Sequence, residues 1–341
     1  MNIKKALIID GNFLLNKNTF ALHKDKLLFG YLQRSLEDSV NAYSNLHYWD
    51  KIYFVSDSKS SSWRKNLFHD YKGNREKSED IDWEFVFTIY EEFKEDLSQK
   101  PNVVLLEEDS IEGDDWISYV VNEKNKEGYS FLIIASDHDL KQLINFNLNP
   151  LTINMMSNEF LNREKVYIPK NYEVFMTELN KNRSMDLFEL NDNGAFHDFI
   201  KMFLEKRTVN ESDPIQSLIT KMISGDKSDN IDSVFRKQTK TGKWQGIGDA
   251  GAKKIYDMYI NEFGVPDIND DDLFENIADL VCESKKASYS NMESIQNNLA
   301  FNRQLVDLNN LPDFVIEKMK NKLDSIEEPI DELKTDDDWG F

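Results

Sequence analysis

Four short segments of the chain are continuously apolar, and longer stretches with helical spacing separate them. Each apolar segment is rich in Val, Ile, Leu or Phe, a pattern typical of parallel strands that are buried on both faces. The predicted strands span residues 6–9, 52–56, 103–106 and 131–135. Strands that alternate with helices form βαβ units. The sequence therefore predicts an α/β fold with a doubly wound, mainly parallel sheet.

The spacing of apolar residues between the strands predicts helices over 27–46, 83–97 and 114–127, with Gly128 closing the last of them. Beyond residue 185 we expect a mostly helical chain, with a turn at 191–194, helices at 196–206 and 215–223, and a helical block over 271–323. The predicted organisation is an α/β domain over 1–190, a helical region over 191–326 and an acidic tail over 327–341.

Residues 57–82 do not fit this alternation. They are polar, basic and rich in Ser, with scattered apolar residues that include Trp63, Phe68 and Tyr71. A connection of this length between a strand and a helix is usually functional or disordered. We expect a helical insertion that becomes ordered on substrate.

The composition excludes several classes of protein. No apolar run approaches the roughly 20 residues that span a bilayer, and the run at 6–9 is too short for a signal peptide. The single cysteine, Cys282, cannot form an internal disulfide or a thiolate metal site. We therefore expect a protein without membrane association in a reducing, cytoplasmic setting.

The net charge of −21 taken alone argues against a nucleic-acid partner, because Lys and Arg make the phosphate contacts. Two segments reverse the local balance. Residues 59–77 hold six cationic and two acidic residues, and residues 235–254 hold six cationic residues and one acidic residue. Either segment by itself is most simply a solvated surface, but a basic patch on an acidic protein is also the electrostatic footprint of a polyanion site.

Acidic residues follow all four predicted strands, and a further pair lies in a later segment. The set comprises Asp10, Asp57, Glu112, Asp114, Asp115, Asp137, Asp139, Asp226 and Asp229. Ligands of doubly wound sheets bind at the carboxyl ends of the strands. We therefore expect these side chains to converge on one edge of the sheet.

Converging carboxylates repel one another unless cations neutralise them. Mg²⁺ and Mn²⁺ prefer oxygen ligands, whereas five scattered His and one Cys make zinc a poor competitor. Two such ions suit phosphodiester hydrolysis, because one activates the attacking water and the other stabilises the leaving oxygen. Each acidic residue alone is most simply a helix cap, a helix N-terminus or a turn; their common order and context favour one site with two Mg²⁺ or Mn²⁺ ions.

The ordered motifs resemble those of the flap endonuclease/5′-3′ exonuclease family. Within residues 6–255 they are Ile9-Asp10-Gly11-Asn12, Ser56-Asp57, Tyr71-Lys72-Gly73-Asn74-Arg75, Glu112-Gly113-Asp114-Asp115, Ser136-Asp137-His138-Asp139-Leu140 and Gly225-Asp226-Lys227-Ser228-Asp229-Asn230-Ile231. Residues 57–84 and 221–230 are most similar to the ribonuclease H branch of this family in T-even bacteriophages. The set is highly specific, although each motif alone is weak.

The resemblance implies the roles of particular residues. A first metal site corresponds to Asp10, Asp57, Glu112, Asp114 and Asp137, and a second to Asp115, Asp139, Asp226 and Asp229. Lys72 and Arg75 match the basic pair of a helical arch at about 57–100, where they clamp the scissile phosphate. Arg64, Lys65 and Tyr71 are expected to contact DNA. The arch aromatics, Trp63, Phe68 and Tyr71, either stack on unpaired bases or pack to hold the arch together.

Residues 246–254 are similar to the helix-hairpin-helix of the family, which we expect at about 220–262. Gly246 and Gly248 would let backbone N–H groups approach a duplex phosphate, and Lys253 and Lys254 would add charge. Family members often hold a monovalent cation there, so the resemblance extends to K⁺. This element departs from the T-even branch, where we expect it to be less regular.

The activity that the resemblance implies is hydrolysis near the 5′ ends of duplex DNA and RNA·DNA, with removal of RNA primers during phage replication in a bacterial cytoplasm. The partners expected are DNA and RNA·DNA with 5′ ends or flaps, bound by a monomer. The acidic tail with its terminal Trp339 and Phe341 is either a docking peptide for a sliding clamp or single-strand-binding protein, or a frayed solvated end.

Two alternatives remain open from the sequence. A PIN-type endoribonuclease shares strand-end carboxylates but normally lacks the long insertion and the hairpin. A catalytically inert DNA-binding replication factor is disfavoured because a dead site need not keep its acidic set. A phosphatase of the haloacid dehalogenase type is excluded, because Asp10-Gly11-Asn12 lacks the second Asp that such enzymes carry two residues after the nucleophile.

Overall fold

The computed structural model describes residues 4–75, 78–143, 152–155, 160–162, 165–183, 185, 195–211 and 213–327. The expected turn at 191–194 and the tail beyond residue 327 lie outside these ranges. Among the described residues, no helix has both the length and the apolar character needed to cross a bilayer.

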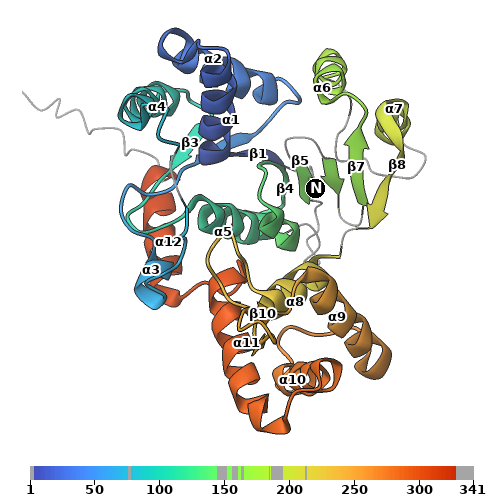
Figure 1. The fold of residues 1–341 in the computed structure, drawn as a ribbon. Helices are drawn as coiled ribbons and strands as arrows, with labels where there is room; N and C mark the ends of the chain where they lie inside the picture. Colours follow the sequence, from blue (N-terminus) through green and yellow to red (C-terminus); the bar gives the residue numbers. More distant parts are fainter. Residues whose placement is uncertain are drawn as a thin grey trace, which may run out of the picture.

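An eight-stranded sheet forms the centre of the α/β part (Figure 1), with the strand order β3-β2-β1-β4-β5-β6-β7-β8. The strands are β1 (Lys4–Asp10), β2 (Lys51–Val55), β3 (Val103–Leu106), β4 (Tyr129–Ile134), β5 (Thr152–Met155), β6 (Phe160–Asn162), β7 (Lys165–Pro169) and β8 (Leu204–Glu211). Strands β1 to β5 pair in parallel, and β5 to β8 pair as antiparallel neighbours. The mainly parallel sheet and its four predicted strands are confirmed.

Successive side chains of a strand point to opposite faces of the sheet. Because the parallel strands are apolar on both faces, helices cover both faces. On β1, Leu7 and Ile9 pack with α1 (Gly11–Lys24), α2 (Leu28–Ser44) and α4 (Trp83–Ser98). Ala6 and Ile8 pack on the opposite face with α5 (Gly113–Lys126) and α12 (Asp313–Glu327). The expected helices at 27–46, 83–97 and 114–127 correspond to α2, α4 and α5.

The last described helix, α12, returns to the sheet rather than ending the helical region. Val315, Met319 and Leu323 are buried against the core of α5. At the end of α12, Glu327 accepts a hydrogen bond from Lys124 at 2.5 Å and one from Tyr53 at 3.3 Å. The C-terminal helix is therefore a structural part of the α/β layer, which its position in the sequence did not indicate.

The helical region has a separate core, centred on α8 (Pro214–Ser224), α9 (Asp249–Phe263), α10 (Leu273–Lys285) and α11 (Met292–Val306). The expectation that the chain is mostly helical beyond residue 185 is wrong at β8. Helix α7 (Ala195–Phe203) ends where β8 begins, and β8 pairs with β7 as the edge strand of the sheet. Edge strands need no two-sided apolar pattern, so the polar sequence of β8 gave no strand signal.

The described parts of the polar segment, 57–75 and 78–82, pack onto the molecule instead of standing free. Trp63, in the short helix α3 (Trp63–Leu67), is 4% exposed and lies in the hydrophobic core between the sheet and α5. Tyr71 is 3% exposed and lies in the core of the helical region. Phe68 also packs against that core. Of the two roles weighed for these aromatic residues, packing is the one that this structure shows.

The expected helix-hairpin-helix region has α8 and α9 packed together, but a two-stranded antiparallel ribbon lies between them in sequence. Its strands are β9 (Arg236–Gln238) and β10 (Trp244–Gly246), paired from Trp244 opposite Gln238 to Gly246 opposite Arg236. Figure 1 shows this helical region below the sheet. Lys221 of α8 pairs with Asp139, which follows β4, so the region lies at the carboxyl ends of the parallel strands.

Candidate metal and phosphate site

The order of the parallel strands reverses between β1 and β4, and this is where doubly wound sheets bind ligands. Asp10 is the last residue of β1 and also caps α1, because its Oδ1 accepts a hydrogen bond from the Phe13 amide at 3.0 Å. Asp137 follows β4, and its Oδ1 accepts from the Asp139 amide at 2.8 Å. The helix-cap explanation and the common-site explanation of Asp10 are thus compatible.

Four carboxylates, from the ends of β1, β2 and β4 and the first turn of α5, influence one another electrostatically. Burial raises the pKa of Asp10, and the charges of Asp57 and Asp137 add to this effect, giving a value of about 7. Burial raises the pKa of Asp114 well above its usual range, with further contributions from Asp137, Asp10 and Asp57. These four aspartates therefore form one group of interacting carboxyl groups, and we call it the central group.

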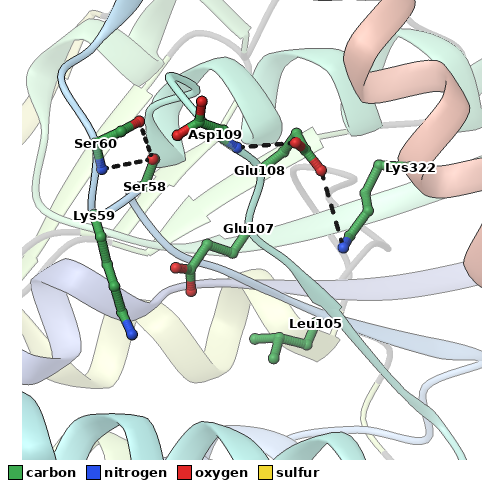
Figure 2. A pocket seen from close by; sticks show the side chains of 8 residues that line it. All are labelled: Ser58, Lys59, Ser60, Leu105, Glu107, Glu108, Asp109 and Lys322. Carbon is green, nitrogen blue, oxygen red and sulfur yellow. Dashed lines mark hydrogen bonds and ion pairs between the residues drawn. The ribbon is translucent and has the colours of Figure 1, made fainter.

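The loops after β2 and β3 position Asp57 in this group. Its Oδ1 accepts a hydrogen bond at 2.7 Å from the amide of Gly113, at the start of α5. Ser58, next to Asp57, lines a hollow of about 660 Å³. Figure 2 shows Ser58 bonded to Ser60 there and Lys322 of α12 pointing toward Glu108. The Ser58 hydroxyl also accepts from the Ser110 amide at 3.1 Å. The two loops are thus tied together directly behind Asp57.

Asp139 and Asp226 form a second group through a cation that the sequence analysis had not assigned. Lys221, in α8, pairs with Asp139 and lies 2.7 Å from an oxygen of Asp226. Burial raises the pKa of Asp139 to about 6 despite Lys221, with Asp137 contributing in the same direction. Burial acts to raise the pKa of Asp226, but Lys221 and Ser228 stabilise its charged form, and the pKa is lowered overall. The signal available was a lysine about one helical turn before Gly225-Asp226.

Glu112 and Asp115 are held by Arg64, which corrects two expectations. The Arg64 side chain lies 2.7 Å from Glu112 Oε2 and 2.8 Å from Asp115 Oδ1, and Trp63 donates to Asp115 Oδ2 at 2.8 Å. Arg64 is 2% exposed, so in this structure it cannot contact DNA. Asp115 is fully buried on the side of Trp63, so it does not join Asp139 and Asp226.

Tyr71 is also unavailable to DNA, because it is buried and its hydroxyl donates to Glu112 at 3.3 Å. The Lys72 ammonium pairs with the other oxygen of Glu112. Burial would raise the pKa of Glu112, but Lys72 and Arg64 lower it to about 2. Glu112 is therefore a charged carboxylate surrounded by donors, at the edge of the central group.

Lys72 and Arg75 are brought to the site by a turn that docks on the loop after α8. The Lys72 amide donates to the Asp229 carbonyl at 2.9 Å, and the Arg75 guanidinium lies 2.5 Å from Asp229 Oδ1. Asn74 and Asn230 add hydrogen bonds of 2.7 and 3.0 Å across the same contact. Two basic residues therefore lie beside the carboxylates, and Asp229 is brought to the site mainly through Arg75.

The remaining residues expected to bind DNA differ in their surroundings. Lys65, Gly248, Lys253 and Lys254 are exposed. A side chain at Gly246 would place its Cβ 2.3 Å from the Ser233 hydroxyl, so this glycine is required for internal packing. Gly248 precedes α9 and has open space around it. It also lines a cavity of about 510 Å³ that extends to Asp139, Lys221 and Asp226.

The residues of the site fit hard cations through the kind of atom that they offer, which is carboxylate oxygen. Burial and the neighbouring carboxylates raise the pKa values of Asp10 and Asp114, so their charged forms are disfavoured unless a cation compensates them, and oxygen ligands suit Mg²⁺ or Mn²⁺. Over the described ranges, however, no three carboxylate, imidazole or thiol groups are already arranged to hold an ion. Lys72, Arg64, Arg75 and Lys221 supply positive charge to the surrounding carboxylates instead.

Comparisons with known proteins find relatives among the nucleases. Residues 5–172 match the family model of the 5′-3′ exonuclease, N-terminal resolvase-like domain. The chain is 30% identical over 112 residues to ribonuclease H of Enterobacteria phage T4, covering 32% of this chain and 37% of the relative. It is 24% identical over 257 residues to a 5′-3′ exonuclease of Mycoplasmopsis pulmonis, covering 75% and 67%. The chain thus spans 37% of the length of the first relative and 67% of the second.

Solved structures share the fold over nearly the whole chain. The 5′-exonuclease of bacteriophage T5 with bound zinc ions has a TM-score of 0.58 at 17% identity, covering 94% of this chain and 99% of its own. The flap endonuclease of the same phage in a complex with DNA and metal ions has a TM-score of 0.54 at 16% identity, covering 94% and 98%. Residues 5–172 thus match the N-terminal domain of the 5′-3′ exonucleases, and the chain as a whole is similar in sequence and fold to proteins of the flap endonuclease/5′-3′ exonuclease family.

Proposed function

We propose that this protein is a divalent-metal-dependent nuclease that hydrolyses phosphodiester bonds near the 5′ ends of duplex DNA and RNA·DNA, as a 5′-3′ exonuclease and flap endonuclease. The observation that carries the proposal is the central group, Asp10, Asp57, Asp114 and Asp137, with a basic pair beside it. Carboxylates that share one pocket need cations, and a phosphodiester needs positive charge next to those carboxylates.

The central group would hold one Mg²⁺ or Mn²⁺ ion, and Asp139, Asp226 and Asp229 would supply oxygen ligands for a second. When bound, such ions lower the pKa of a water molecule and stabilise the leaving oxygen. The protein positions these oxygens through main-chain contacts, such as the amide of Gly113 on Asp57 and that of Ser228 on Asp226. Lys221 pairs with Asp139 and Asp226 in the structure, so it would have to yield these oxygens to a second ion.

Lys72 and Arg75 would bind the scissile phosphate and stabilise the charge that develops on it. Both now pair with acidic residues of the site, Lys72 with Glu112 and Arg75 with Asp229. Arg75 retains 53% side-chain exposure, so one face of its guanidinium is accessible to a phosphate oxygen. Water attack would leave a 5′-phosphate on the product and a 3′-hydroxyl on the released piece.

The biological role that we propose is removal of RNA primers during phage DNA replication. The T4 relative, which is named ribonuclease H, supports this role. The similar T5 structures, one of them solved with DNA and metal ions, support a DNA substrate. A K⁺ ion near residues 246–254 and a replication partner at the tail remain part of the proposal, and the tail lies outside the described residues.

The experiment compares wild type and Asp137→Asn on 5′-labelled flap, nicked and RNA-primed duplexes with Mg²⁺. We expect cleavage near the 5′ end by the wild type and a loss of at least a hundredfold in the variant, because a central ligand is removed. Asp271→Asn, an exposed site outside the group, is the matched control and should retain activity. Cleavage of single-stranded RNA alone would favour a PIN-type endoribonuclease, and binding without cleavage would favour an inert replication factor.

A further inference from the structure

The ribbon between α8 and α9 is not needed to connect the two helices. The Ile247 amide donates to the Ser233 hydroxyl at 3.0 Å, although the two residues are 14 positions apart. The chain therefore leaves and returns at almost the same point, and β9 and β10 form an excursion between them. Gly246 allows the close return, because a Cβ there would meet Ser233. The base of the ribbon is consequently fixed to the helical core, in which Ile247 and Val234 are buried.

The excursion carries a concentration of positive charge. Four cationic residues and no acidic residue lie between Ser233 and Gly248. Arg236 pairs with Asp232, but no ion pair with a described carboxylate is found for Lys237, Lys240 or Lys243. All three lysines are exposed. On a protein with a net charge of −21, three unneutralised ammonium groups on one ribbon form a localised site for an anion.

Trp244 adds an aromatic surface to this charge. Its side chain is 62% exposed, and both strands of the ribbon are exposed along their whole length. In the register, Trp244 lies opposite Gln238, and its neighbours along the chain are Lys243 and Gln245, so its partners in the ribbon are polar or cationic. A large exposed aromatic ring among lysines is suited to a polyanion that also offers flat apolar groups, as nucleic acids do.

The position of the ribbon relates it to the candidate site. Ile247 and Gly248, which directly follow β10, line the same cavity as Asp139, Lys221 and Asp226. A nucleic acid whose phosphate reaches these carboxylates therefore passes close to the base of the ribbon. Two-stranded β-ribbons fit the major groove of duplex DNA, and lysines contact its backbone without regard to sequence.

We propose that the β9–β10 ribbon is a second grip on the duplex part of the substrate, in which Lys237, Lys240 and Lys243 contact backbone phosphates and Trp244 packs against the groove. This inference rests on the proposed function, because it takes the substrate of the candidate site to be a duplex. It assigns duplex affinity to residues outside both the carboxylate site and the exposed Lys253–Lys254 pair.

The test measures the salt dependence of binding to a 5′-flap duplex, in an Asp137→Asn background so that the substrate stays intact. Each phosphate contact contributes about 0.9 to the slope of log affinity against log salt, so the triple variant K237Q/K240Q/K243Q should lose about 2.7 from that slope. Between 50 and 200 mM salt, the parent would then lose about 40-fold more affinity than the variant. The matched control K24Q/K26Q/K320Q removes three exposed lysines elsewhere and should leave the slope unchanged.

Trp244→Ala should weaken duplex binding with little effect on the slope, because it removes an uncharged contact. For both ribbon variants we expect a smaller loss on a single strand of the same sequence. A slope unaltered in the triple variant overturns the ribbon proposal alone, and so does an equal loss on single strands. A parent protein that binds no duplex overturns both the ribbon proposal and the proposed function. Cleavage by the wild type with an unaltered slope would leave only the ribbon proposal refuted.

Discussion

Replacing Arg64 by methionine tests whether this buried guanidinium positions the acidic residues at the start of α5. Arg64 pairs with Glu112 and Asp115 and donates through Nε to the Leu305 carbonyl at 2.9 Å. The α3 segment, the first turn of α5 and the end of α11 therefore meet on one side chain. Methionine has a similar apolar stem but leaves all of these acceptors without the guanidinium.

The expected loss follows from burial. Asp115 is 0% exposed and Glu112 is 7% exposed, so water cannot replace Arg64 at either carboxylate. Removing one partner of a buried ion pair typically costs about 3–5 kcal/mol, because the charge left behind remains buried. Glu112 still has Lys72, which places the cost for this residue at the lower end. We therefore expect the free energy of unfolding to fall by about 3–4 kcal/mol at neutral pH.

Urea denaturation followed by circular dichroism measures this change through the midpoint and slope of unfolding. The pKa of Glu112 is lowered in the folded protein to about 2, so its contribution to stability is present above pH 4.5 and is lost as the pH falls toward 2. The difference between wild type and Arg64→Met should therefore be largest near neutral pH and should shrink toward pH 2.

The matched control is Arg34→Met, because Arg34 pairs with Asp38 at 3.8 Å on an exposed helix face. Exposed pairs are worth about 0–1 kcal/mol, so this variant should unfold almost as the wild type does. A loss below about 1 kcal/mol for Arg64→Met would refute the assignment of Arg64 as a buried tie. The same conclusion would follow if the loss did not depend on pH.

Three further predictions follow from the site. In ion-free buffer, the stability that protonated Asp10 contributes is present below pH 3.8 and is lost as the pH rises to about 7. Asp10→Asn should therefore raise the melting temperature at pH 8 but not at pH 4. Equal melting temperatures of variant and wild type at pH 8 would contradict this. Lys221→Met should bind Mn²⁺ more tightly by calorimetry, because Asp139 and Asp226 lose their shared cation; weaker binding would count against competition. Gly225→Ala should cost about 1–3 kcal/mol in urea unfolding, since φ is +70° and a Cβ would lie 2.3 Å from the Ile231 carbonyl; wild-type stability would show that the loop adapts.

The amino-acid sequence by itself determined the parts that depend on local pattern. Short two-sided apolar runs specify parallel strands, and β1 to β4 formed where those runs predicted them. Because parallel strands point their carboxyl ends to the same edge, the acidic residues after them had to meet there, which Asp10, Asp57, Asp114 and Asp137 do. The family resemblance rested on the same ordered motifs.

Tertiary structure decided which face each polar side chain meets, because that depends on segments distant in sequence. Arg64 and Tyr71 lie in a segment with the composition of a DNA-binding site, yet both are buried. Arg64 lies between α5 and α11, and Tyr71 packs into the core of the helical region. Asp115 turns to Arg64, and Lys221 reaches Asp139 across 82 positions of sequence. Short-range periodicity carries no information about such pairings, because contacts between distant segments form only when separately specified helices and strands pack together.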